Sequence, residues 1–466
     1  MIKKRLSIKR STGKVCLNWL YLFCIILFLQ YNLQAMAGVG SSSVINSKAG
    51  IMLTTEKGMT LFSQNANTQF TPASILKVLT SLCARYYFQD NYHFKTEFFI
   101  VNRPTEHDLQ PPANSKRASG IKKTDLVIKG YADPLFTSEL IAKACHQLSQ
   151  ALRAMNISQI NNIIVDNTFF ASDIKIDGTA SSNNPYDAFV GPLCANFNTV
   201  SFKYSHEKQN YVSAEPQTPL LPFVLTRVKN SGLKEGRVIL SEQESKIYAG
   251  MLVQNFLSQE GINIKGVVTT GDGTISGMNT INDNTENRKT DPQREIKKDV
   301  CRPVYTYTSP YDMDEIIKRL LKYSSNFMAN QLFLSVGAQK FSPPATVEKG
   351  IAAMTEYAQK SLRIKDAVFV EGSGLSRQNK ISPADMIKIL GHFKKSYRLM
   401  QTDSIPDGRN EYYKTGTLNG VRTRCGYIET SKGLYPFVIM VNENSAGYDK
   451  IKQFLWKTLS DYERKG

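Results

Sequence analysis

The stretch Thr71–Thr80, TPASILKVLT, places a lysine inside a segment that is otherwise largely apolar. Pro72 suits the first turn of a helix, and the apolar residues after it recur at helical spacing. Ser74 and Lys77 are three residues apart, so a helix puts them on one face with the amine near the hydroxyl. Burial would lower the pKa of the lysine and let it take a proton from the serine. The stretch therefore predicts a buried helix carrying a nucleophile beside a base.

The Ser-x-x-Lys spacing also fits an ordinary amphipathic helix and is common by chance. The chain contains it four more times, at Ser11 with Lys14, Ser119 with Lys122, Ser172 with Lys175, and Ser205 with Lys208. Spacing alone therefore does not identify a catalytic serine. Other parts of the chain must supply the context.

A second polar cluster, Ser324-Ser325-Asn326, lies in a stretch with helical spacing from Asp312 to Leu334. A hydroxyl and an amide two residues apart, at a helix break or turn, can transfer a proton and hold a substrate amide. The same spacing recurs at residues 63–65 and 181–183. Such residues are often turn or capping groups, so this cluster is also weak by itself.

A third cluster, Lys414-Thr415-Gly416-Thr417, occurs once, on the first of three expected strands at hairpin spacing. A lysine and two hydroxyls on an edge strand offer a cation and donors to a carboxylate. Gly416 lets a substrate backbone approach closely. The alternative is an edge strand with an exposed lysine.

The three clusters follow the order Ser-x-x-Lys, Ser-x-Asn, Lys-Thr-Gly of the penicillin-recognising serine enzymes. With them, the chain resembles the class C low-molecular-mass penicillin-binding proteins, which are D-alanyl-D-alanine carboxypeptidases and endopeptidases of the bacterial cell wall. The resemblance covers nearly the whole chain after an N-terminal segment. Three further segments look like the family: Asp133-Pro134, Asn196–Val200 and Gly372–Arg377.

The resemblance implies an α/β (α+β) fold in which an antiparallel sheet with helices on both sides carries two smaller inserted domains. Lys77 and Ser324 are 247 positions apart, too far for a compact β-lactamase. Polar, proline-containing residues 103–123 and the polar residues 269–298 suggest boundaries. We expect a catalytic domain at residues 38–95 and 299–466, an α/β insert at 96–170 and 269–298, and a mostly β insert at 171–268.

The resemblance also implies a proton path. Ser74 would attack the carbonyl carbon between two D-alanines, with Lys77 as its base. Ser324 and Lys414 would pass the proton to the leaving amine. The oxyanion would lie against the backbone N–H groups of Ser74 and Thr417.

Substrate-binding roles are implied in the same way. Asn326 would hold the peptide, and Thr415 with Thr417 would bind the terminal carboxylate beside Gly416. Arg377 and Asp166 resemble the family's groups near the substrate side chain. A surface arginine and a turn aspartate are the alternatives for these two residues.

The sequence departs from the family pattern at three places. Glu371 precedes Gly-Ser-Gly where the family usually has an acidic residue, and it keeps the charge on a longer arm. Asn330 stands where a glutamate is common, and Tyr131-Ala132 replaces small residues before Asp133. None of these positions belongs to the expected proton path, so we expect activity to be retained.

Residues 1–37 have the features of a secretory signal, namely a basic head, an apolar run at 20–29 and the small-x-small sequence Ala35-Met36-Ala37. We expect cleavage after Ala37 and export to the periplasm, with an uncleaved anchor as the alternative. The segment carries six of the positive charges, so the net charge falls from +18 to +12. This basic remainder favours contact with anionic envelope components over nucleic acid. Five widely spaced cysteines remain, which predicts no disulfide framework.

Other enzyme classes fit the sequence less well. None of the five histidines lies in a recognisable hydrolase motif, no Gly-x-Ser-x-Gly or His-Glu-x-x-His sequence occurs, and we expect neither a metal nor an organic cofactor. A β-lactamase and a catalytically silent wall-binding protein are the remaining alternatives. The balance between carboxypeptidase and endopeptidase action, and the oligomeric state, stay open.

Overall fold

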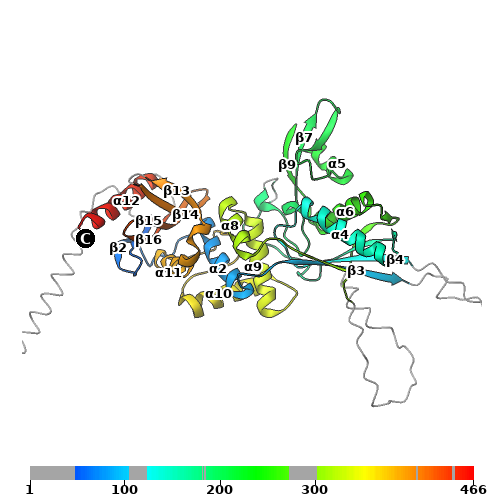
Figure 1. Ribbon diagram of the computed structural model, residues 1–466. Helices are drawn as coiled ribbons and strands as arrows, with labels where there is room; N and C mark the ends of the chain where they lie inside the picture. The colour runs from blue at the N-terminus through cyan, green and yellow to red at the C-terminus, as the bar shows by residue number, and fades with distance from the viewer. Residues whose placement is uncertain are drawn as a thin grey trace, which may run out of the picture. The chain divides into compact units, whose positions relative to one another are not determined.

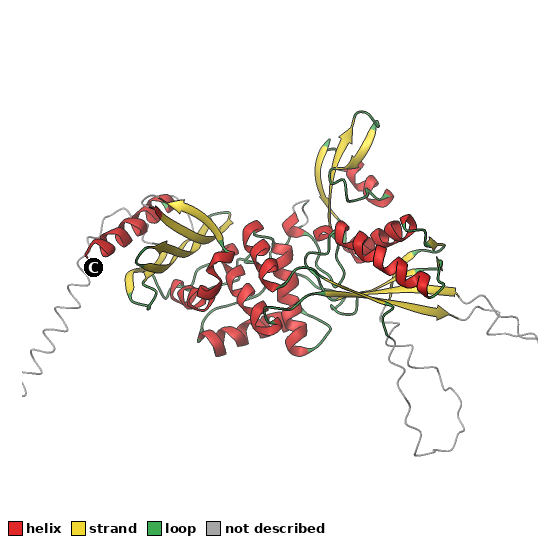
Figure 2. Cartoon of the chain, in the orientation of Figure 1, coloured by secondary structure: helices red, strands yellow, loops and turns green. Residues whose placement is uncertain are grey.

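The structure is a computed structural model that describes residues 48–103, 123–180, 182, 185–271, 302–405, 408–442 and 447–465. Figures 1 and 2 show how the helices and strands of these residues are arranged. The predicted signal at residues 1–37 lies outside the described residues. So does most of the expected linker at 269–298, of which only residues 269–271 are described.

A six-stranded antiparallel sheet joins the two ends of the described chain. Its strand order is β13-β14-β15-β16-β1-β2, so the first strand pairs with the last, with Ile51 opposite Ile439. Short apolar runs at residues 51–53 and 59–62 predict a hairpin, and the pairing of these two segments confirms it. The three terminal strands expected from the sequence are also confirmed. The strands are β1 (Gly50–Thr54), β2 (Thr60–Gln64), β13 (Gln401–Ile405), β14 (Arg409–Leu418), β15 (Val421–Thr430) and β16 (Gly433–Asn442).

Helices cover both faces of this sheet (Figure 1). Side chains alternate along β16, and Val438 and Met440 belong to the hydrophobic core that the helices α2, α9 and α11 share. Phe437 therefore lies on the opposite face, together with Phe62, against which Phe454 of α12 packs. The expected antiparallel sheet with helices on both sides is thus confirmed. The helices are η1 (Ala73–Leu76), α2 (Lys77–Phe88), α8 (Met313–Tyr323), α9 (Asn326–Phe341), α10 (Val347–Leu362), α11 (Pro383–Phe393), η4 (Lys394–Leu399) and α12 (Tyr448–Lys465).

A second, mixed sheet has the order β11-β6-β4-β3-β12 and a hydrophobic core of its own. Helices α4 and α6 pack against each other and against this sheet. The short strands β5 and β10 form a separate parallel pair. The elements are β3 (Lys95–Arg103), β4 (Lys123–Gly130), α4 (Ser138–Ala154), β5 (Gln159–Ile160), β6 (Ile163–Asp166), α6 (Glu242–Gln259), β10 (Asn263–Ile264), β11 (Val268–Gly271) and β12 (Tyr305–Thr308).

A third sheet is small and antiparallel, with the order β8-β7-β9. Helix α5 lies next to β8. Two short 3-10 helices precede the sheet in the sequence. The elements are η2 (Pro185–Asp187), η3 (Asn196–Asn198), β7 (Thr199–Ser205), β8 (Asn210–Ser213), α5 (Pro222–Asn230) and β9 (Glu235–Ile239).

Two elements, a helix and a strand, differ from the domain segments expected from the sequence. Residues 171–268 were expected to be mostly β, but α6 is a helix of 18 residues that covers the second sheet. Its start was readable, because Ser241 and Glu244 form a capping box. Strand β12 was expected in the catalytic segment, yet it pairs with β3 of the second sheet. Strand pairing over long sequence separations is not visible in local patterns, which explains the position of β12.

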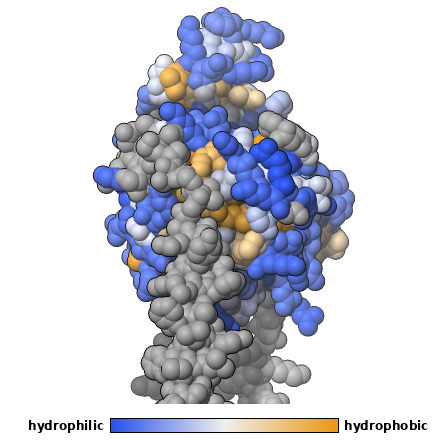
Figure 3. Space-filling view, turned by 90° about the vertical axis from the view of Figure 1, so that its left-hand side faces the viewer, coloured by the Kyte–Doolittle hydropathy of each residue, from blue (hydrophilic) through white to orange (hydrophobic). Residues whose placement is uncertain are grey.

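No helix among the described residues is long and apolar enough to cross a membrane. The face shown in Figure 3 is largely hydrophilic over its described residues, with small hydrophobic areas between them. Helix α12 is amphipathic. Its buried residues form one stripe: Tyr448, Ile451, Leu455 and Leu459. The apolar set Ile451, Phe454, Leu455 and Leu459 in the sequence predicts a helix that covers the sheet, and α12 packs on β2 and β16.

Candidate active site

Lys77 is completely buried and lies at the centre of a polar cluster. Its Nζ donates hydrogen bonds to Ser74 Oγ at 2.8 Å, to Asn326 Oδ1 at 2.7 Å and to the Ser373 carbonyl at 2.7 Å. Burial lowers the pKa of Lys77 well below its ordinary value, and the nearby charge of Lys414 lowers it further. An uncharged amine has a lone pair, so the contact with Ser74 can take up the hydroxyl proton.

The turn that carries Ser74 is held from two sides. The predicted helix begins as the 3-10 turn η1 and continues as α2, and Ala73 adopts a left-handed conformation with φ of +50°. The hydroxyl of Thr423 on β15 donates to the carbonyl of Pro72 at 2.7 Å. On the other side, Thr80 donates to the carbonyl of Gly372 at 2.5 Å. A strained residue next to a nucleophile is typical of functional sites, because the surrounding structure must hold it.

The Ser-x-Asn cluster lies where one helix ends and the next begins. Ser324 is the C-cap of α8 in a left-handed conformation with φ of +53°, and Ser325 is the N-cap of α9, accepting from the N–H of Met328 at 3.2 Å. The stretch with helical spacing is therefore two helices with a break between them. The break between the two helices places Asn326 at Lys77 and Ser324 at Lys414.

Lys414 is buried on β14, which contradicts the alternative of an exposed lysine. Its Nζ donates to Ser324 Oγ at 2.7 Å and to the Thr415 carbonyl at 2.6 Å. Burial lowers the pKa of Lys414 to about 8. The two lysines thus hydrogen-bond different hydroxyls, Lys77 that of Ser74 and Lys414 that of Ser324. The hydrogen bond from Lys77 to Asn326 links the Ser-x-x-Lys and Ser-x-Asn motifs, so the structure brings all three motifs together.

The second half of β14 has a free edge on its β13 side within the described ranges. Strand β13 pairs with residues 409–413 only, so residues 414–418 are paired on one side, by β15. Gly416 lies close to the Ser74 turn, because a Cβ there would be 2.7 Å from the Ser74 nitrogen. An extended peptide can add to this free edge while its backbone passes the serine hydroxyl.

Glu371 determines the shape of the loop that faces Lys77. Its buried carboxylate accepts from both the N–H and the hydroxyl of Ser373 at 2.6 Å, from the N–H of Gly374 at 2.7 Å and from Asn379 Nδ2 at 2.7 Å. Asn330 Oδ1 accepts from the N–H of Gly372 at 2.9 Å. Two of the three departures from the family pattern, Glu371 and Asn330, are therefore buried groups with hydrogen-bond partners. The sequence marked Glu371 only as an acidic residue, and nothing local indicated its partners.

The expected substrate-binding residues are not all placed together. Thr415 and the exposed Thr417 lie on the free edge of β14, and Arg377 Nη2 donates to the carbonyl of Asn419 just after that strand. Asp166 is buried at the end of β6, where Lys129 lies 3.1 Å away. Its other oxygen accepts from the N–H and hydroxyl of Thr168 at 2.8 and 2.6 Å. Asp166 has none of the other expected site residues among its described partners.

Sequence reasoning missed two contacts beside the site. The hydroxyl of Ser376 donates to Asp177, which ties the Glu371 loop to the segment after β6. Thr423 holds the carbonyl before the Ser74 turn. The position of Ser376 within Gly372–Arg377 was a signal, but Asp177 and Thr423 carried none. Among the described residues, no group of three or more His, Cys, Asp or Glu side chains is arranged to hold a metal ion.

The chain is similar in sequence to known proteins. A family model described as D-Ala-D-Ala carboxypeptidase 3 (S13) matches residues 34–285 and 293–406, which include the first two motifs. The chain is 24% identical over 437 residues to the D-alanyl-D-alanine carboxypeptidase DacB of Haemophilus influenzae, covering 82% of each protein. It is 21% identical over 442 residues to a D-alanyl-D-alanine carboxypeptidase from an Actinomadura species, covering 85% of this chain and 77% of that protein.

The chain is also similar in fold to a solved structure. The crystal structure of penicillin binding protein 4 (dacB) from Haemophilus influenzae matches with a TM-score of 0.64 at 17% identity, covering 88% of this chain and 96% of that one. The two proteins therefore share a fold. Because the family model matches more than half of its residues, the chain belongs to the D-Ala-D-Ala carboxypeptidase 3 (S13) family, as its resemblance to the penicillin-binding proteins led us to expect.

Proposed function

We propose that the protein is a serine-type D-Ala-D-Ala carboxypeptidase and D-alanyl-endopeptidase that acts on peptidoglycan stem peptides through an acyl-enzyme at Ser74. β-Lactam antibiotics would acylate the same hydroxyl. The observation that carries the proposal is the 2.8 Å contact between Ser74 Oγ and a buried Lys77 with a strongly lowered pKa. The relatives named D-alanyl-D-alanine carboxypeptidase support the choice of substrate.

In the acylation step, Ser74 Oγ attacks the carbonyl carbon of the penultimate D-alanine as its proton passes to the amine of Lys77. The carbonyl oxygen becomes an oxyanion against the backbone N–H groups of Ser74 and Thr417. The C–N bond then breaks, and the leaving nitrogen receives a proton through Ser324 and Lys414, which are 2.7 Å apart. Water later hydrolyses the ester, releasing the shortened peptide and restoring the serine.

Substrate binding uses the free edge of β14. Asn326 holds the peptide amide, while Thr415 and Thr417 bind the terminal carboxylate next to the Lys414 cation. Arg377 and Asp166 are the proposed groups near the substrate side chain. Asp166 has the weaker support of the two, because its described partners are Lys129 and Thr168.

The proposed location follows from the substrate. Peptidoglycan lies outside the cytoplasmic membrane, so the protein would be exported and would act in the periplasm, with residues 1–37 as its signal. The basic character of the rest of the chain suits peripheral contact with anionic envelope components.

The test is labelling with fluorescent penicillin followed by digestion of purified muropeptides. Wild-type protein is expected to carry one label at Ser74 and to release D-alanine, monomers from dimers, or both, whereas Ser74→Ala does neither. A label at another side chain, or none, would refute the proposal. Rapid nitrocefin turnover would indicate a β-lactamase instead. A folded protein without any covalent adduct would indicate a silent binding protein.

A further inference from the structure

A pocket of about 580 Å³ adjoins the Ser324–Asn326 turn and is not used by the proposed chemistry. Its walls include Phe197, Arg237, Tyr311, Arg319 and Tyr323. Of the described site residues, Ser324 and Asn326 line it, whereas Ser74, Lys77 and Lys414 do not. The pocket therefore begins at the Ser-x-Asn turn and extends away from the nucleophile.

One wall of the pocket is built on helix α8, which ends at Ser324. The guanidinium of Arg319 lies over the ring of Tyr311 at 4.6 Å, and Glu315 holds it with an ion pair of 2.9 Å. Tyr323 directly precedes Ser324 and is 65% exposed. This wall offers an oriented guanidinium and the side chains of two tyrosines.

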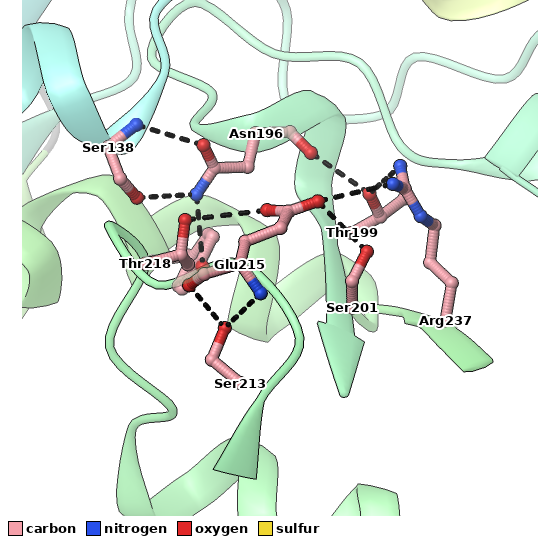
Figure 4. Close-up of polar contacts among 9 residues, drawn as sticks. Ser138, Asn196, Thr199, Ser201, Ser213, Glu215, Thr218 and Arg237 are labelled. Atoms are coloured by element: carbon pink, nitrogen blue, oxygen red, sulfur yellow. Dashed lines mark hydrogen bonds and ion pairs between the residues drawn. The ribbon is translucent and has the colours of Figure 1, made fainter. Parts of the chain in front are cut away.

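The facing wall comes from the small third sheet. Arg237 on β9 donates to Glu215 at 3.3 Å and to Thr199 Oγ1 at 3.2 Å, as Figure 4 shows. Glu215 also accepts from Ser201 at 2.9 Å. The network thus holds the Arg237 guanidinium at the pocket while these contacts use only part of its five N–H donors.

The same network is joined to the left-handed turn at residues 196–198. Asn196 binds the N–H and the hydroxyl of Ser138 at 2.9 and 2.8 Å, and its carbonyl accepts from Thr199 at 3.0 Å (Figure 4). Phe197 of this turn packs edge-on against Phe327 of α9. The turn therefore attaches the small sheet to the helix that carries Asn326, which gives the pocket a defined wall.

The position of Ser324 indicates which part of a substrate reaches this pocket. In the proposed mechanism, the leaving nitrogen receives its proton through Ser324, so it must lie beside that hydroxyl. The substrate group bonded to this nitrogen therefore lies next to the pocket that Ser324 lines. A carboxypeptidase substrate has only one alanine there, whereas a cross-linked substrate has a second stem peptide with amide groups and free carboxylates.

We propose that this pocket binds the leaving-side stem peptide of a cross-linked substrate, with Arg237 and Arg319 binding its carboxylates and the aromatic rings packing on its chain. The inference rests on the proposed function and extends it, because it names residues that favour endopeptidase substrates. Arginine suits the role, since its planar guanidinium binds carboxylates with paired hydrogen bonds.

The test compares two substrates on the full-length protein, a pentapeptide monomer ending in D-Ala-D-Ala and a cross-linked peptide dimer. The variants are Arg319→Gln and Tyr323→Ala. The described contacts of both side chains lie outside the proposed proton path, although Tyr323 directly precedes Ser324 in the chain. Arg398→Gln is a matched control, since Arg398 also lies over a tyrosine ring, that of Tyr397, and pairs with Glu429, but outside the pocket. The rate of fluorescent penicillin labelling checks that the catalytic cleft is intact in every variant.

Arg319→Gln is expected to lower kcat/KM for the dimer about tenfold, mainly through KM, because one hydrogen bond to a charged group is lost. Tyr323→Ala should lower it by about three- to tenfold, because the packing of its ring on the peptide chain is lost. Cleavage of the pentapeptide and labelling by penicillin should stay within about twofold of wild type. An equal loss on both substrates, or no loss on the dimer, would refute the pocket assignment while leaving the proposed function intact. If wild-type protein is not labelled and cleaves neither substrate, the proposed function fails and this inference fails with it.

Discussion

Glu371 accepts hydrogen bonds from both the backbone N–H and the hydroxyl of Ser373, each at 2.6 Å. The carbonyl of the same serine accepts from Lys77 Nζ at 2.7 Å. A buried carboxylate thus orients the loop that orients the lysine. Its charge also acts on the lysine, because it raises the Lys77 pKa against the larger lowering effect of burial.

Replacing Glu371 with glutamine should destabilise this loop. The amide has one acceptor oxygen in place of two, so buried N–H groups of the loop lose their partner. We expect Glu371→Gln to lower the free energy of unfolding by about 1–3 kcal/mol, measured by urea denaturation. Glu235→Gln is the control, because Glu235 is exposed on β9 and should change little. Equal effects of the two variants would contradict the structural role of Glu371.

The pH dependence of acylation should be bell-shaped, because one lysine must be neutral and the other charged. The rate should rise with pH as Lys77 loses its proton, at a pH well below the ordinary lysine pKa. It should fall as the pH rises through the Lys414 pKa of about 8, since the cation is then lost. Stopped-flow penicillin acylation across the pH range measures both limbs.

Lys414→Arg tests the assignment of the alkaline limb. A guanidinium stays charged throughout this range, so the variant should acylate more slowly but lose the limb near a pH of about 8. An unchanged alkaline limb in this variant would show that another group titrates there.

Removing the base should abolish most of the acylation without unfolding the protein. Lys77→Ala is expected to slow penicillin labelling by about two to four powers of ten. Lys457→Ala on the exposed side of α12 is the control and should label like wild type. A fall of less than about tenfold in Lys77→Ala would mean that another group accepts the serine proton.

Gly416 should be intolerant of a side chain, because β14 passes very close to the serine turn. A Cβ at Gly416 would lie 2.7 Å from the Ser74 nitrogen and 2.9 Å from Ala73 Cβ. Gly416→Ala should therefore displace the strand from the oxyanion position and slow acylation by about tenfold or more. The measurement is again the rate of penicillin labelling.

Gly391→Ala provides the matched glycine control. Gly391 lies within α11, and nothing is within 4 Å of an added Cβ. Alanine there should raise the free energy of unfolding by about 0.5–1 kcal/mol, because glycine is costly inside a helix. Acylation should be unchanged. A similar loss of activity in both glycine variants would point to a general effect on folding instead of a close approach at Gly416.

Local signals predicted several elements closely. The apolar spacing of residues 383–393 predicts a helix, and this helix is α11, with Ser382 as its cap and Pro383 in its first turn. The three terminal strands also appear where alternating and apolar runs placed them. In each case the capping residues or the apolar spacing lie within the element or next to it, so the element can be predicted without knowledge of the fold.

Long-range contacts were not predictable in this way. Helix α6 was hidden in a segment expected to be mostly β, although its capping box marked its start. The hydrogen bond from Lys77 to the Ser373 carbonyl spans 296 residues, and the pairing of β12 with β3 crosses some two hundred residues of chain. Such contacts depend on which distant segments pack against each other, and the local spacing of residues does not predict this.

The sequence by itself determined that Ser74 and Lys77 share a face and that three polar motifs occur in a family's order. Only the tertiary structure decided that the pKa of Lys77 lies well below its ordinary value and that acceptors surround its amine, since Asn326 and Ser373 reach it from 249 and 296 residues away. It also decided that Lys414 is buried instead of exposed. The physical reason is that a pKa depends on desolvation and neighbouring charges, and both arise only when distant segments pack together.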